Sequence, residues 1–203
     1  MPLSAPAPRK ERQHRKIRTE GFLRDDGLWD IEGHLLDLKE YATENPYLGV
    51  VPPGEPIHEM HVRLTIDDAR EIHAIEVAID AHPYPICPQA VPNFQRLVGE
   101  NVGRGFTARL HELVGRTQGC THTVWLIQCC AITALHSIAG RVGWGWKGET
   151  VSVFGPTAPG QRSPLIGRCF AYAQDGMVVR DLFPEHYTGP QSVAAMTANG
   201  KNN

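Results

Sequence analysis

The segment Asp25-Asp-Gly-Leu-Trp-Asp-Ile-Glu-Gly-His-Leu35 decides the fold of the first half of this chain. An Asp-Gly pair between two strand-like runs is a strong short-range signal for a β-hairpin. The runs on either side of it are residues 17–24 and 28–38. We therefore predict that these two segments pair as antiparallel strands.

The same segment places three titratable residues at alternate positions, namely Asp30, Glu32 and His34. Side chains at positions i, i+2 and i+4 of a strand lie on one face, about 7 Å apart from one to the next. Such a row of two carboxylates and an imidazole is able to transfer protons or to bind a metal ion. A solvent-exposed strand face has the same composition, so both interpretations stay open.

More strands and helices are predicted beyond the hairpin. Residues 57–66 alternate between apolar and polar positions, with His58 on the apolar side, and residues 71–80 form a fourth strand. Two short helices, each followed by a glycine, and a long helix with two apolar stripes come next; they span residues 92–98, 107–114 and 121–139. Because both stripes of the long helix are apolar, we expect it to be buried in the middle of the protein.

These elements predict an α+β fold. An antiparallel β-sheet of about four strands packs against a long central helix and two short helices, with an extended C-terminal lobe that includes residues 165–172 and 177–182. A Gly-, Trp- and Pro-rich surface loop is expected between residues 140 and 164. The predicted organisation is a flexible basic arm (1–16), a single domain (17–187) and a disordered tail (188–203).

Composition limits the classes of partner. The chain has 203 residues, of which 41% are hydrophobic, and its formal net charge of −2 gives no overall attraction to nucleic acid or to an anionic membrane. No apolar run reaches the roughly 18 residues of a membrane span. Five cysteines, an odd number, favour reduced thiols over a disulfide framework. We expect a cytoplasmic protein that binds neither nucleic acid nor membranes, and a homo-oligomer stays open.

The start of the long helix carries the motif Gly119-Cys-Thr-His122. Backbone N–H groups and the helix dipole at this end favour a thiolate, so Cys120 is a candidate nucleophile or metal ligand, and packing alone is the other interpretation. His122 lies one turn before Trp125, and the two are candidates for holding a substrate. His58, at the edge of the sheet, is a candidate general base with a pKa moved toward the value that such a base needs.

Six motifs together resemble a bacterial family catalogued as domain of unknown function 2889, over about residues 17–190. They are Gly27-Leu-Trp-Asp-Ile-Glu-Gly-His34, Gly54-Glu-Pro-Ile-His-Glu-Met60, Leu64-Thr-Ile-Asp67, Pro83-Tyr-Pro-Ile-Cys87, Gly119-Cys-Thr-His122 and Phe183-Pro-Glu-His-Tyr187. The resemblance implies a cytoplasmic bacterial protein connected with the catabolism of aromatic compounds. The chain departs from the family pattern at Trp125, where a glutamate is usual, and at His61, where an aromatic or aliphatic residue is common.

The predicted function is that of a small enzyme of the lyase or isomerase type. It uses histidine and carboxylate acid–base chemistry on an aromatic small molecule, lignin-derived ones included, without an organic cofactor. We expect the site where the open end of the sheet meets the start of the long helix. The candidate catalytic residues are His58, His122, Asp30, Glu32, His34 and Cys120, and the candidate substrate-binding residues are Trp125, Tyr84, His61 and Trp29.

Two other classes of function stay open. A metal or cluster carrier is the alternative, because a zinc ion or an iron–sulfur cluster takes four ligands of this kind. The four candidates are Cys87, Cys120, Cys169 and His122. A non-catalytic module that binds aromatic acids is the third class. Nucleotide-dependent, serine-hydrolase and zincin chemistry are disfavoured, because their glycine-rich, Gly-x-Ser-x-Gly and His-Glu-x-x-His motifs are missing.

Overall fold

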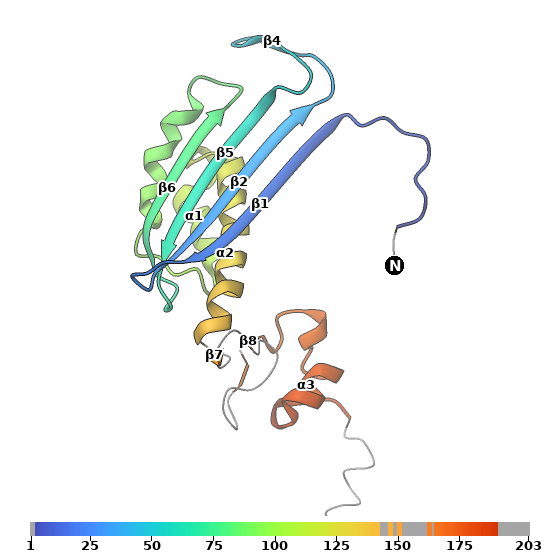
Figure 1. Ribbon diagram of the computed structural model, residues 1–203, viewed down its shortest axis with the longest axis vertical. Helices are drawn as coiled ribbons and strands as arrows, with labels where there is room; N and C mark the ends of the chain where they lie inside the picture. Colours follow the sequence, from blue (N-terminus) through green and yellow to red (C-terminus); the bar gives the residue numbers. More distant parts are fainter. Residues whose placement is uncertain (1–2, 143–145, 148–149, 152–161, 164, 191–203) are drawn as a thin grey trace, which may run out of the picture. The chain divides into compact units, whose positions relative to one another are not determined.

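The computed structural model of the protein describes residues 3–142, 146–147, 150–151, 162–163 and 165–190 (Figure 1). The chain divides into two compact units, Met1–Ile138 and Ala139–Asn203. This division differs from the single domain predicted over residues 17–187. Most of the predicted loop between residues 140 and 164, and most of the predicted tail, lie outside the described residues.

The first unit is built on a four-stranded antiparallel sheet with the order β1-β2-β5-β6. Its strands are β1 (Gln13–Leu23), β2 (Trp29–Lys39), β5 (Pro56–Ile66) and β6 (Ile72–Ala81). A separate two-stranded ribbon pairs β3 (Thr43–Asn45) with β4 (Gly49–Val51). The predicted α+β class, the hairpin and the four-stranded antiparallel sheet are confirmed.

Helices cover one face of this sheet and leave the other open (Figure 1). They are η1 (Cys87–Leu97), α1 (Phe106–Val114), η2 (Arg116–Gln118) and α2 (Thr121–Val142). One apolar core joins the sheet to the helices, and its fully buried side chains include Ile31, Leu35, Met60, Leu64, Phe94, Leu110, Leu126 and Ile127. Residues that alternate along β2 and β5 therefore separate into a core face and an open face.

The long helix α2 approaches the sheet closely because two strand positions carry no side chain. A Cβ atom on Gly33 would lie 2.5 Å from the Cys130 sulfur and 3.0 Å from a Leu126 methyl group, and one on Gly21 would meet the Ser137 side chain. The hydroxyl groups of Thr19 and Thr133 also hydrogen-bond at 2.7 Å between sheet and helix. Glycine at these positions thus determines how near the helix lies.

The expectation that α2 is buried on both faces is wrong. Its second stripe lies on the exposed side, where Trp125 is 44% and Ile132 58% exposed. Residues Thr121–Ala139 are nevertheless long and apolar enough, by length and composition alone, for a membrane span, contrary to the expectation from the sequence. The buried side of the helix packs on the sheet, as the core helix of a sheet protein does.

Two boundaries differ from the prediction. The strand β1 begins at Gln13, so the last four residues of the predicted arm belong to the sheet. Their alternation of basic and polar residues lacks the apolar pattern that would have indicated a strand, and pairing with β2 overrides it. Residues Met177–Leu182, predicted as extended, form the helix α3.

The second unit has a small core of its own. Besides α3 it contains η3 (Phe170–Tyr172), η4 (Pro184–His186) and a short ribbon of β7 (Trp146–Lys147) with β8 (Thr150–Val151). Its buried residues are Ile166, Tyr172, Val179 and Phe183. The regular structure in the described part of residues 165–190 is thus helical, in contrast to the extended lobe that the sequence predicts.

Candidate functional site

The candidate site begins with a row of three side chains across the sheet. Asp37 lies on the core face of β2, with its side chain 5% exposed, and its register partners are Arg15 on β1 and His58 on β5. Arg15 donates two hydrogen bonds to Asp37, from Nε to Oδ1 and from Nη2 to Oδ2, both of 2.6 Å. His58 Nδ1 lies 3.2 Å from Asp37 Oδ2. The buried Asp37 carboxylate therefore contacts one side chain from each of the two neighbouring strands.

The first turn of α2 adds a second imidazole to this row. The ring of His122 stacks on that of His58, with ring centroids 3.8 Å apart. His122 Nε2 lies 3.8 Å from Asp37 Oδ2, and His122 Nδ1 lies 3.9 Å from the Cys120 sulfur. His122 thus lies between a thiol and a buried carboxylate, and we call Asp37, His58, His122 and Cys120 the inner cluster.

Cys120 directly precedes α2, where unpaired backbone N–H groups favour a negative charge. Burial raises the pKa of the Cys120 thiol, but the contact with the His122 ring, together with the backbone N–H groups of His122 and Thr123, outweighs it and lowers the pKa from 9.0 to about 7. About half of the thiol is then ionised at neutral pH.

Asp37 and His58 have shifted pKa values as well. Burial opposes ionisation of Asp37, but the hydrogen bonds and charge of Arg15, with His58 and His122 adding to them, hold its pKa below 3.8. Burial, and the neighbouring His122, lower the pKa of His58 from 6.5 to about 4. His58 is therefore neutral at pH 7, and its pKa moves away from the value that a general base needs, opposite to the expectation.

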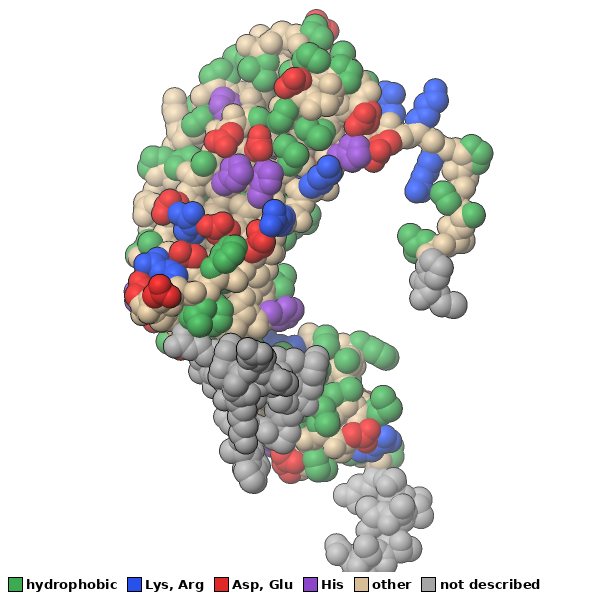
Figure 2. All heavy atoms as spheres, viewed as in Figure 1, with side chains coloured by type: hydrophobic (Ala, Val, Ile, Leu, Met, Phe, Trp, Pro, Cys, Tyr) green, Lys and Arg blue, Asp and Glu red, His purple; other side chains and the backbone are tan. Residues whose placement is uncertain are grey.

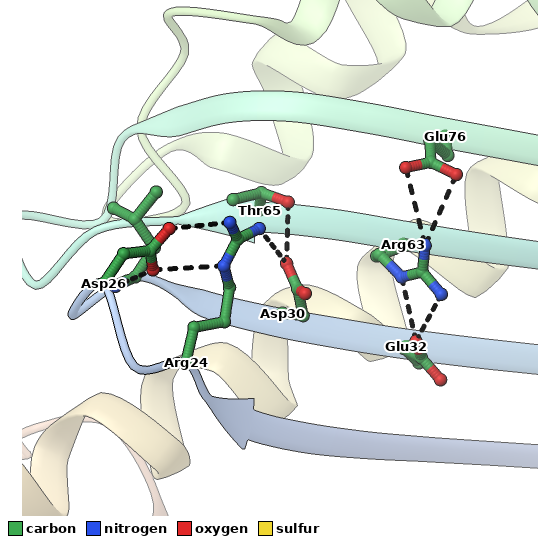
Figure 3. A network of polar contacts seen from close by, with 8 residues as sticks. Arg24, Asp26, Asp30, Glu32, Arg63, Thr65 and Glu76 are labelled. Carbon is green, nitrogen blue, oxygen red and sulfur yellow. Dashed lines mark hydrogen bonds and ion pairs between the residues drawn. The ribbon is translucent and has the colours of Figure 1, made fainter.

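The row of Asp30, Glu32 and His34 is not part of this site. These residues alternate with Ile31, Gly33 and Leu35 along β2, so they lie on the open face of the sheet, opposite to α2. Figure 3 shows Asp30 hydrogen-bonded to Thr65 and contacting Arg24, and Glu32 paired with Arg63. The expectation that this row and His122 enclose one shared hollow is wrong, because a strand directs alternate side chains to opposite faces.

The predicted substrate-binding residues are separated in space. Trp29 belongs to the core, 7% exposed, and its indole N–H donates to Asp68 at 2.9 Å. Tyr84 is exposed and contacts Tyr47 edge to face. His61 lies on the open face of β5, whereas the exposed ring of Trp125 lies beside the inner cluster, 5.6 Å from the guanidinium carbon of Arg15.

Of the four predicted metal or cluster ligands, the structure brings together Cys120 and His122. Cys87 begins η1, and Cys169 precedes η3 in the second unit. Within the described residues, the groups of three side chains whose ligand atoms lie within 4.8 Å of one another are Asp37, His58, His122 and His34, Glu59, His61. Neither group contains a cysteine.

Sequence reasoning missed Arg15 and Asp37, although both left a signal. Asp37 occupies the same alternation as Trp29, Ile31 and Leu35, so it is a carboxylate on the apolar face of its strand. The register that the Asp-Gly turn imposes pairs it with Arg15. The apolar alternation of β2 could therefore have indicated the buried carboxylate, and extending the hairpin register to Arg15 could have indicated its partner.

The chain is an α+β protein with a partly buried cluster of one thiol, two imidazoles and one carboxylate where a sheet meets the start of a helix. It belongs to the family described as "Protein of unknown function (DUF2889)", whose model matches residues 13–136. No curated protein and no solved structure matches the chain. The matched region includes all the residues of the inner cluster together with Arg15 and Trp125.

Proposed function

We propose that this protein is an enzyme of the lyase or isomerase type, in which His122 transfers protons between Cys120 and a small substrate while Asp37 stabilises the charged imidazole. The observation that carries the proposal is the position of His122, 3.9 Å from a sulfur atom on one side and 3.8 Å from a buried carboxylate on the other. Catalytic hydrogen bonds are often long before the substrate binds. An imidazole in this position is suited to take up a proton while the carboxylate stabilises its charge.

The residues of the inner cluster have different roles in this proposal. His122 is the proton-transferring base, and Cys120, with a pKa of about 7, is the second acid or base. His58 is neutral at pH 7 and a weak base, so we assign it a positioning role. It contacts the Asp37 carboxylate, and its ring stacks on that of His122. Asp37 orients both imidazoles, the role that the sequence assigns to Asp30 or Glu32.

The aromatic substrate remains part of the proposal. The ring of Trp125 is 44% exposed beside the Arg15 guanidinium, and an exposed tryptophan next to a catalytic cluster offers a flat surface for another ring. Family membership itself supplies no substrate, since the family is described only as one of unknown function. Lignin-derived aromatic compounds are the first candidates for a binding screen, and no organic cofactor is part of the proposal.

The proposal predicts a specific reactivity of Cys120. The rate of alkylation by iodoacetamide, followed from pH 5 to pH 10 by mass spectrometry of the cysteine-containing peptides, should give a pKa of about 7 for Cys120. In the His122→Gln variant this pKa should rise by at least about one unit, because the imidazole that stabilises the thiolate is gone.

The exposed Cys169 in the same samples is the internal control, and its profile should not change with His122→Gln. An equal pKa for Cys120 in the wild type and in His122→Gln would show that the imidazole does not act on the thiol, and the proposed proton transfer would then have no basis.

A second candidate function is metal binding by the inner cluster. Asp37, His58 and His122 offer one carboxylate and two imidazole ligand atoms within 4.8 Å of one another, and His58 is neutral, as a metal-binding imidazole must be. Against this, Arg15 occupies both oxygen atoms of Asp37 and adds a positive charge. The enzyme proposal therefore takes precedence.

Elemental analysis and an absorption spectrum of protein purified without oxygen separate these two functions. If the metal proposal holds, the wild type should contain about one zinc or iron ion per chain that the His122→Gln variant lacks. If the enzyme proposal holds, the two proteins should have the same metal content. The predicted carrier that uses Cys87, Cys120, Cys169 and His122 would in addition lose its metal in Cys87→Ser.

A further inference from the structure

A second group of ligating side chains lies on the open face of the sheet, away from the inner cluster. His34 on β2 and His61 on β5 are direct register partners, and their rings stack in parallel, 4.4 Å apart with an interplanar angle of 6°. Glu59 on β5 and Asp80 on β6 are their acidic neighbours. Figure 2 shows histidine side chains gathered among acidic and basic ones on this face.

The nitrogen and oxygen atoms of this group converge. His34 Nε2 lies 3.0 Å and His61 Nε2 3.9 Å from the same oxygen, Glu59 Oε1, and His61 Nε2 lies 3.4 Å from Asp80 Oδ2. Ligand atoms bound at 2.0–2.2 Å around a tetrahedral zinc ion are about 3.3–3.6 Å apart. His34, His61 and Glu59 each offer a ligand atom within 4.8 Å of the other two, so small side-chain rotations would bring these three atoms to an ion.

The backbone keeps these side chains in place. His34 and His61 are opposite each other in the ladder, and Glu59 is two residues from His61 on the same face of β5. The register of β5 with β6 shifts between Glu59 and Met60, and this β-bulge adds Asp80 as an extra residue on β6. Ligands on paired strands need little ordering, because the sheet already determines where they lie.

The charges around the group also favour a cation. His34 and His61 line an open hollow of about 400 Å³ on this face. Both guanidinium groups lining this hollow are paired with carboxylates, Arg18 with Glu20 and Arg63 with Glu32 and Glu76. This arrangement differs from the inner cluster, where an arginine occupies the carboxylate itself.

We infer that His34, His61 and Glu59 form a binding site for a divalent transition-metal ion, with zinc as the reference ion and Asp80 as a neighbouring carboxylate. Two imidazoles and a carboxylate are a donor set that zinc and its neighbours accept, whereas magnesium prefers oxygen ligands alone. The ion links β2 and β5, so its binding stabilises the folded sheet. The inference is independent of the proposed function, which concerns the opposite face.

The experiment titrates chelator-treated full-length protein with zinc chloride by isothermal titration calorimetry, with and without excess magnesium. The wild type should bind zinc, and magnesium should not displace it. His34→Ala and His61→Ala should each weaken this binding at least about a hundredfold, because a direct ligand is lost. His73→Ala removes another exposed strand histidine, which pairs with Asp67, and should leave the binding unchanged.

Two further measurements keep the outcomes distinct. His122→Gln should also leave this binding unchanged, and if only that variant loses zinc, the ion belongs to the inner cluster and the inference is wrong. In the wild type, zinc should protect His34 and His61 from modification by diethyl pyrocarbonate, a readout that needs no variant. Absence of zinc binding, or binding that survives both His34→Ala and His61→Ala, would overturn the inference.

Discussion

Replacement of Asp37 by alanine is expected to lower the free energy of unfolding by about 3 kcal/mol at pH 7. The change removes both hydrogen bonds to Arg15 and the contact with His58, and it leaves a partly buried guanidinium without its carboxylate. Loss of one partner of a buried ion pair costs about 3–5 kcal/mol, and the lower end applies because the Arg15 side chain is 36% exposed. Urea unfolding followed by circular dichroism measures the effect.

Glu32→Ala is the matched control for Asp37→Ala. Glu32 is on the same strand and also bonds to an arginine of a neighbouring strand, but it lies on the open face and is 41% exposed. Exposed ion pairs contribute about 0–1 kcal/mol, so the control should lose less than about 1 kcal/mol. If both variants lose the same free energy of unfolding, the buried pair of Asp37 and Arg15 stabilises the fold no more than an exposed pair does.

Acidification from pH 7 to pH 4 is expected to remove about 3 kcal/mol of stability through His58 alone. The pKa of His58 is about 4 in the folded protein and 6.5 as its ordinary value. Between these two values the unfolded chain takes up a proton that the folded protein excludes, so stability falls as the pH falls. Asp37 adds to the loss only near and below its ordinary pKa of 3.8.

Urea unfolding at pH 7, 6, 5 and 4 tests this expectation in the wild type and in His58→Gln. The variant has no imidazole at this position, so its stability should change much less over the window from pH 6.5 to pH 4. His136→Gln replaces an exposed histidine of α2 and should keep the wild-type profile. A wild-type slope that persists in His58→Gln would assign the effect to another group.

Local sequence signals were sufficient for most of the fold. The Asp-Gly turn predicted the hairpin of β1 and β2, the alternation of residues 57–66 predicted β5, and glycines marked the ends of the short helices. Each of these signals comes from residues that are close together in the sequence, so it can be detected without knowledge of the packing. The helix of Met177–Leu182 was missed because Val178 and Val179 favour a strand locally, and the packing of Val179 in the small C-terminal core overrides that preference.

The candidate site was only half predictable. His58, His122 and Cys120 were identified by their motifs, and the structure brings them together. The predicted acidic partner was wrong, because the row of Asp30, Glu32 and His34 lies on the open face, whereas the one buried carboxylate among the residues that the structure describes is Asp37. Whether a strand residue faces a helix depends on long-range packing, and only the apolar residues alternating with Asp37 indicated its side.

The absence of side chains at Gly21 and Gly33 influences the candidate site, although neither residue belongs to it. His122 reaches Asp37 only because the helix that carries it can settle directly onto the strands at these points. A methyl group at Gly33 would collide with Leu126 and Cys130 and push the helix α2 away from the sheet. The His122 ring would then move away from the Asp37 carboxylate. The proposed proton transfer would then be sensitive to a residue that contacts neither Cys120 nor His122.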